Sequence, residues 1–150
     1  MQFDSVDAVL DFAIKNEQDA SDFYTELASK MEKAHMKQAF ESFAAEERGH
    51  KAKLESVKKG KMAKLTKAKV LDLKIGDYLV EQKASASMDY QSALILAMKQ
   101  EKAAFRLYSD LAATADDAGT RELFLGLAQE EAKHKLRFEI AYDEDFLRDN

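Results

Sequence analysis

The chain has 150 residues, with no proline, only five glycines and 34% charged residues, a composition that favours one domain built from long helices. It contains no cysteine, which excludes disulfides, thiolate metal sites and a cysteine nucleophile. The net charge of −5 disfavours nucleic acid as a partner, and the sequence has neither a membrane-spanning apolar run nor a signal-peptide pattern. We therefore expect an all-α cytoplasmic protein with no nucleic-acid or membrane partner.

Two helical patterns occupy the first part of the chain. Apolar residues recur at spacings of three and four over residues 6–31 and again over residues 36–57. The pattern breaks at about residues 30–35, where a turn is expected. These features predict a first helical hairpin at about residues 5–59.

The segment at about residues 60–87 differs from the helical patterns on either side. It is too long for a tight turn, and residues such as Val70, Leu73 and Tyr78 make it too apolar for a free linker. We interpret it as a crossover that runs along the bundle and contains short helical pieces. Its lysines continue a basic stretch, which we interpret as a solvated face, with an anion or partner site as the alternative.

A second hairpin is predicted at about residues 88–142. It has the same apolar periodicity, and Asp116, Asp117 and Gly119 mark its turn. A polar tail is expected over residues 143–150. Residues 1–150 are therefore interpreted as one domain.

The two hairpins are related by an internal repeat. They align without gaps at an offset of 84 residues, so that chemically distinctive residues coincide. We interpret the repeat as a duplicated helical hairpin. The coinciding pairs include Glu17 with Glu101, Tyr24 with Tyr108, Glu47 with Glu131, and His50 with His134.

The spacing of the glutamates places them at one level of the predicted bundle. Glu17 and Glu47 are 30 residues apart, as are Glu101 and Glu131, and the midpoint of each pair falls in a predicted turn. In an antiparallel hairpin the two members of each pair therefore meet at the same height. A histidine follows the second glutamate of each pair by three residues, which places both side chains on one helical face.

Six polar residues consequently lie on the apolar faces of the four predicted helices. Buried carboxylates that repel one another need a compensating cation, and two divalent ions would balance four carboxylates. Carboxylate and imidazole donors suit Fe, Mn or Zn, and a carboxylate-bridged pair best suits Fe or Mn. We predict a dinuclear metal site at Glu17, Glu47, His50, Glu101, Glu131 and His134. The alternatives are a metal-free bundle with satisfied polar residues and a duplicated relic that has lost activity.

Other polar residues lie near these positions. Tyr24 and Tyr108 follow a predicted ligand by two turns, and either hydrogen-bond a ligand carboxylate or serve as core aromatics. Glu46 and Glu130 are rotated away from the site, and we expect them to pair at the surface. His35, in the first turn, is also expected at the surface.

These motifs resemble the rubrerythrin-like branch of the ferritin superfamily over about residues 5–142. The resemblance implies a ferritin-like four-helix bundle that holds two iron ions, with Mn or Zn as other metals that could be loaded. It further implies that Glu47 and Glu131 bridge the metals. Glu17 with His50 would then bind one metal, and Glu101 with His134 the other.

The sequence departs from this family in two respects. The absence of cysteine removes the rubredoxin domain that usually delivers electrons, and Ala104 replaces an additional glutamate linked to efficient peroxide reduction. The six-ligand set is similar to that of bacterioferritin, whereas the crossover and the duplication are more similar to rubrerythrin relatives.

The resemblance implies a di-iron oxidoreductase that reacts with peroxide or O₂ in oxidative-stress defence. A ferroxidase of bacterioferritin type and a non-catalytic metal-binding bundle are the alternatives. The expected partners are a small oxidant, an external electron donor such as a rubredoxin-like protein, and a second copy of the chain in a homodimer.

Overall fold

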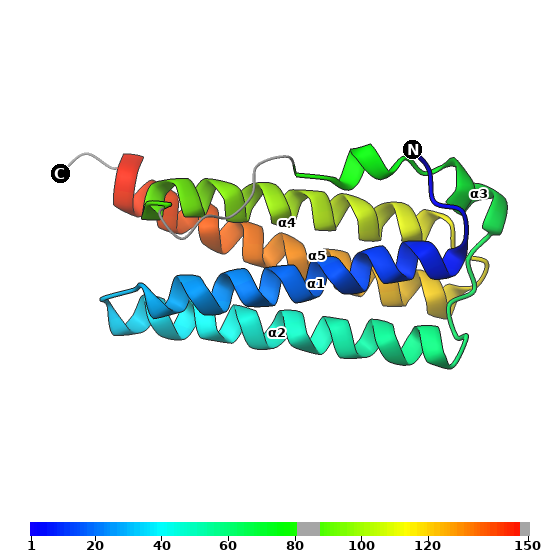
Figure 1. Cartoon of the computed structure of the whole chain (residues 1–150), viewed down its shortest axis with the longest axis horizontal. Coiled ribbons are helices and arrows are strands. Elements are labelled where there is room, and N and C mark those ends of the chain that lie inside the picture. Colours follow the sequence, from blue (N-terminus) through cyan, green and yellow to red (C-terminus); the bar gives the residue numbers. More distant parts are fainter. Residues whose placement is uncertain (81–87, 148–150) are drawn as a thin grey trace.

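Four long helices run side by side and form an all-α bundle (Figure 1). A computed structural model of the chain describes residues 1–80 and 88–147. The fold agrees with the predicted four-helix bundle. The long helices are α1 (Val6–Ser29), α2 (Ala34–Lys59), α4 (Tyr90–Ala113) and α5 (Ala118–Tyr142).

The internal repeat is preserved in the helix boundaries. Both ends of α4 lie 84 residues after those of α1, and the starts of α2 and α5 differ by the same number. The first helix of each hairpin is also capped in the same way: Ser5 accepts a hydrogen bond from the amide of Ala8, and Asp89 accepts one from that of Ser92. The bundle is therefore made of two duplicated hairpins, α1–α2 and α4–α5.

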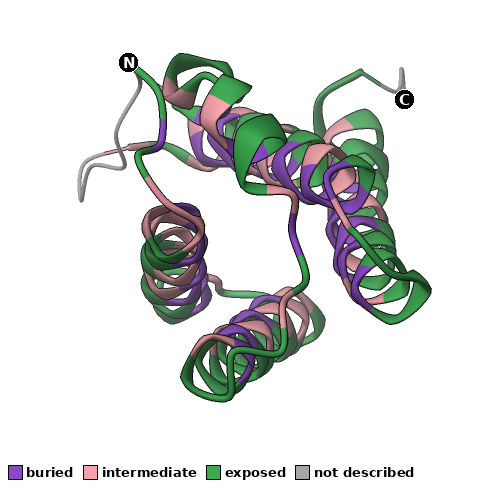
Figure 2. Cartoon of the chain, turned by 90° about the vertical axis from the view of Figure 1, so that its right-hand side faces the viewer, coloured by how far each residue is buried: buried purple, intermediate pink, exposed green. Residues whose placement is uncertain are grey.

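The buried side chains line the inward faces of the long helices (Figure 2). They form two apolar clusters, one towards each end of the bundle. On each long helix the predicted metal ligands fall between residues of the two clusters, so the apolar core encloses a polar layer. The first cluster includes Leu10, Leu54, Leu107 and Phe124, and the second includes Phe40, Ala44, Ala97 and Phe138.

The crossover between the hairpins is fixed to the bundle by polar contacts at several points. The amide of Thr66 donates to the carbonyl of Thr114 at 2.7 Å, and the hydroxyl of Tyr78 donates to Asp110 at 2.6 Å. The ring of Tyr78 also stacks on Phe3, with centroids 6.3 Å apart. The crossover contains two short helices, α3 (Lys67–Asp72) and the 3₁₀-helix η1 (Ile75–Tyr78).

The segment after α5 continues as a single π-helical turn, η2 (Asp143–Leu147). Phe146 packs against the rings of Tyr90 and Tyr142, with centroids 5.7 and 5.2 Å apart. This part of the predicted polar tail is therefore held against the bundle by aromatic contacts. The parts of the predicted crossover and tail at residues 81–87 and 148–150 lie outside the described residues.

Candidate metal centre

The structure brings all six predicted ligands together in the polar layer. The four glutamates are 1–2% exposed and His134 is 3% exposed, although charged side chains are rarely buried so fully without partners. Each long helix supplies at least one of these side chains because the residues fall on its inward face. The donors are Glu17 from α1, Glu47 and His50 from α2, Glu101 from α4, and Glu131 and His134 from α5.

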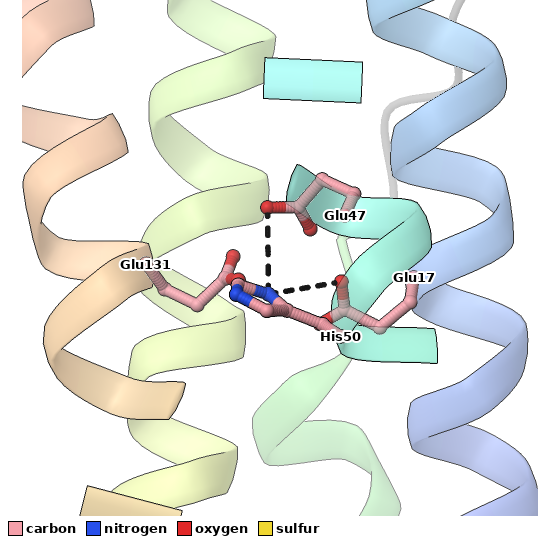
Figure 3. A group of neighbouring side chains, drawn as sticks. All are labelled: Glu17, Glu47, His50 and Glu131. Carbon is pink, nitrogen blue, oxygen red and sulfur yellow. Dashed lines mark ion pairs between the residues drawn. The ribbon is translucent and has the colours of Figure 1, made fainter. Parts of the chain in front are cut away.

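The six residues form two overlapping groups of metal-ligating atoms. Within each group the ligand atoms lie within 4.8 Å of one another. Glu47 and Glu131 belong to both groups, so their carboxylates can be shared between two metal positions. The first group, drawn in Figure 3, is Glu17, Glu47, His50 and Glu131; the second is Glu47, Glu101, Glu131 and His134.

Each histidine directs Nδ1 towards a shared glutamate of the opposite hairpin. Nδ1 of His50 lies 2.8 Å from Glu131 and 3.5 Å from Glu17. Nδ1 of His134 lies 2.9 Å from Glu47 and 3.7 Å from Glu101. The two half-sites are therefore related by the internal repeat.

Two buried tyrosines join the hairpins through the outer glutamates. The hydroxyl of Tyr24 in α1 donates a hydrogen bond to Glu101 in α4, and the hydroxyl of Tyr108 in α4 donates one to Glu17 in α1. Both tyrosines are almost completely buried. Each is thus a core aromatic and also a hydrogen-bond donor to a predicted ligand.

The donor set fits two divalent cations. In each of the six residues, one buried side-chain oxygen or nitrogen has no partner among the described residues other than the glutamates and histidines of the centre itself. Unsatisfied buried polar atoms are costly, and here they converge on one layer of the bundle. Cations coordinated by these atoms would satisfy them and neutralise the four carboxylates, which suits a di-metal site.

Burial sets the protonation of the shared carboxylates in the absence of metal. It raises the pKa of Glu47 and of Glu131 well above the usual glutamate value, and nearby carboxylates reinforce this rise. Burial also disfavours a charge on His134, but the adjacent carboxylates of Glu101 and Glu47 outweigh this effect and raise its pKa to about 11. The metal-free centre therefore retains protons that metal ions must displace.

The structure also reveals a contact that the sequence analysis missed. Glu46 was expected to pair at the surface; its side chain is exposed, but its carboxylate lies 2.5 Å from Nε2 of the buried His134. Glu130, the equivalent residue of the repeat, does pair at the surface, with Lys133 at 3.5 Å. The only sequence signal for the first contact was the position of Glu46, directly before a predicted ligand. His35 is exposed, as expected.

A cavity of about 610 Å³ connects the centre with the surface between α1 and α4. All four predicted glutamate ligands line it, whereas neither histidine does. Its walls include small and apolar side chains such as Ala20, Phe23 and Ala104, and the crossover contributes Leu79 and Val80. A small molecule can therefore approach the centre from its carboxylate side.

Comparisons with known proteins agree with this architecture. A solved structure from Thermotoga maritima, described as a ferritin-like diiron-carboxylate protein, has a TM-score of 0.79 at 18% identity and covers 96% of this chain and 98% of its own. The structure of a hypothetical protein from Pyrococcus furiosus has a TM-score of 0.69 at 23% identity; the match covers 90% of this chain and 86% of the Pyrococcus chain. These likenesses show the fold alone.

No curated protein matches the sequence. Within the described residues, no helix is long and apolar enough to cross a membrane. The family model described as Rubrerythrin, however, matches residues 8–142. The chain belongs to the rubrerythrin family.

Proposed function

We propose that the protein is a non-haem di-iron oxidoreductase that reduces peroxide or O₂ in oxidative-stress defence. The observation that carries this proposal is the set of buried donor atoms that converge from six residues of two repeated hairpins and, among the described residues, find no hydrogen-bond partner outside that set. Two iron ions bound there would supply two electrons to the oxidant. Mn or Zn could be loaded into the same donors.

The residues of the chain would hold these ions in a fixed and largely dry environment. Glu47 and Glu131 would be shared between the two positions, Glu17 and His50 would complete one, and Glu101 and His134 the other. Tyr24 and Tyr108 would fix the outer carboxylates by their hydrogen bonds, which limits the reorganisation that binding requires.

The cavity between α1 and α4 would admit the oxidant. Ala104 lies on its wall, so a larger side chain at this position would narrow the route without removing a predicted ligand. Anaerobic loading with ferrous ion, followed by stopped-flow mixing with peroxide or O₂, tests the reaction. We expect rapid oxidation in the wild type, and slower oxidation with unchanged metal content in Ala104→Leu. An iron-loaded protein that ignores both oxidants would overturn the proposal.

A ferroxidase is the second candidate because Ala104 stands where the family's additional glutamate would be. A ferroxidase must release its oxidised iron and bind more. Repeated additions of ferrous ion under air would distinguish the two functions: continued turnover with accumulation of ferric product favours the ferroxidase. A native protein that contains no transition metal and binds none would leave only the non-catalytic bundle.

An external electron donor follows from the composition of these 150 residues. They contain no cysteine and so cannot form an iron–thiolate centre. We therefore propose that a separate carrier, such as a rubredoxin-like protein, reduces the iron. Reduction of the oxidised protein by a reduced rubredoxin, followed by absorbance, tests this; no reduction would exclude that class of donor. The cytoplasmic location stays a prediction.

We also propose a homodimer through the outer face of α5. Leu125, Leu136 and Ile140 are 40–57% exposed there, and their spacing of 11 and 4 residues places them on one helical face. A two-fold axis across this face would pack the apolar side chains of two copies antiparallel to one another. Leu136→Glu should give a monomer in analytical ultracentrifugation, whereas Leu147→Glu, at an exposed leucine outside this face, should not.

A further inference from the structure

The two histidines of the centre differ in the contact made by the outer ring nitrogen. Nε2 of His134 lies 2.5 Å from the Glu46 carboxylate. Among the described residues, the ion pairs of His50 involve Nδ1, and Glu130 pairs with Lys133 instead. The repeat therefore supplies equivalent ligands, but in the part of the chain that the structure describes only the half-site of His134 has a carboxylate paired with Nε2 of its histidine.

We infer that Glu46 is a positioning residue that makes the two metal positions unequal, so that the position with Glu101 and His134 binds its cation more tightly. This inference rests on the proposed di-metal function and adds an order of filling to it. The metal position with Glu17 and His50 would then fill second.

The physical reason lies in the two nitrogens of the imidazole ring. When a metal ion displaces the proton of Nδ1, Nε2–H can still donate to the Glu46 carboxylate while the lone pair of Nδ1 faces the metal position beside Glu47 and Glu101. The carboxylate also makes the ring a more basic ligand and fixes its orientation. Loss of such an outer partner typically lowers metal affinity by about 10- to 100-fold.

The sequence explains why the repeat is broken at this point. Glu130 is followed three residues later by Lys133, which holds its carboxylate at the surface of α5. Glu46 is followed at the same spacing by Gly49, which has no side chain to compete with His134. Burial adds to the difference, because the side chain of His134 is 3% exposed and that of His50 is 12% exposed.

Gly49 offers a direct test of this explanation. Gly49 is exposed, and a Cβ atom added there would have no neighbour within 4 Å, so the first carbon of a lysine side chain is accommodated. In Gly49→Lys the new ammonium would lie three residues after Glu46, as Lys133 does after Glu130. It should draw the Glu46 carboxylate away from His134 and weaken the first metal position while every ligand is retained.

Calorimetric titration of the metal-free protein with Mn²⁺ measures both positions separately. We expect two binding steps in the wild type, the first at least about 10-fold tighter. Glu46→Ala should weaken the first step by about 10- to 100-fold, whereas Glu46→Gln should weaken it less because its amide oxygen can still accept the hydrogen bond. Glu130→Ala is the matched control, and it should leave both steps unchanged.

Two further readouts assign the effect to the correct position. A crystal grown with one equivalent of Mn²⁺ should show anomalous signal beside His134 rather than His50. Metal-free melting curves check that each variant is folded. Equal steps in the wild type, first occupancy beside His50, or equal losses in Glu46→Ala and Glu130→Ala would overturn the inference while leaving a di-metal centre. A wild type that binds no metal would instead refute the proposed function.

Discussion

The substitution Glu131→Gln distinguishes the effect of the buried carboxylate on the stability of the metal-free protein from its effect on metal binding. Glu131 is 1% exposed, and burial raises the pKa of its carboxyl well above the usual value. The raised pKa favours the neutral carboxyl in the folded metal-free protein, whereas the same carboxyl ionises in the unfolded chain above its pKa of about 4.5. A glutamine of similar shape does not titrate, so it should make the metal-free protein more stable than the wild type at pH 7. In the presence of metal the same change removes a ligand that both positions share.

The stability that metal binding adds follows from the binding equilibrium and the size of the protein. A cation at 100 times its dissociation constant stabilises the folded state by about 2.7 kcal/mol, so two cations contribute about 5 kcal/mol. For 150 residues this corresponds to a rise in Tm of about 10–20 °C. Glu131→Gln should reduce this rise to less than half because both positions lose a donor.

The pH dependence of the metal-free protein provides an independent check. A carboxyl whose pKa is raised by folding contributes stability below its unfolded pKa of about 4.5, and this stability is lost as the pH rises through the folded pKa. Glutamine does not titrate. The metal-free variant should therefore become progressively more stable than the metal-free wild type as the pH increases above about 4.5.

Thermal melts followed by circular dichroism, with chelator or with Mn²⁺, measure all of these effects. Glu130→Gln is the matched control, because Glu130 is adjacent but exposed and pairs with Lys133. It should behave as the wild type does. A Glu131→Gln variant that keeps the full metal-induced rise in Tm would refute the shared-ligand geometry, and a large loss of metal-free stability at pH 7 would refute the assigned protonation.

Three further predictions follow from the same site and its surroundings. Mn²⁺ affinity should increase with pH between 6 and 8, by about tenfold per pH unit for each proton released, because the cations must displace protons from Glu47, Glu131 and His134. Calorimetry in buffers of different ionisation enthalpy counts the protons released. An affinity that does not change with pH would contradict the raised pKa values of these groups. Tyr108→Phe should destabilise the metal-free protein by about 1.5–3 kcal/mol in urea unfolding because Glu17 loses a buried donor; an unchanged stability would show that this hydrogen bond contributes nothing. Phe40→Ala should lower the free energy of unfolding in urea by about 3–5 kcal/mol because it leaves a cavity in the apolar cluster, but it should not change the number of metal ions bound. A changed number of bound ions would show that the apolar cluster and the metal centre are coupled.

The helices and the assembly of the six residues could be predicted from the sequence because two periodic signals reinforce one another. Apolar periodicity identified the inward faces, and the 84-residue offset placed Glu17 and Glu101 at equivalent positions. The helix boundaries of the two hairpins preserve that offset. Antiparallel pairing then required the glutamates of each hairpin to lie at the same height.

The contacts between the hairpins could not be predicted in the same way. Periodicity gives the face on which a residue lies, but it does not say which residue of another helix that face meets. The pairing of the exposed Glu46 with His134 depends on such a contact, and also on the absence of a competing lysine at position 49, which is Gly49. The aromatic docking of Phe146 was missed for a similar reason, since its acidic neighbours made the segment look like a solvated tail.

Anaerobic titration of the metal-free protein with ferrous ion tests the central claim most directly. The two donor groups overlap at Glu47 and Glu131, which predicts two metal ions per chain in one coupled site. We predict saturation at about two equivalents of Fe²⁺ per chain and, after oxidation, a Mössbauer spectrum of a spin-coupled ferric pair. Saturation at one equivalent, no binding, or two magnetically isolated ferric ions would contradict the dinuclear centre.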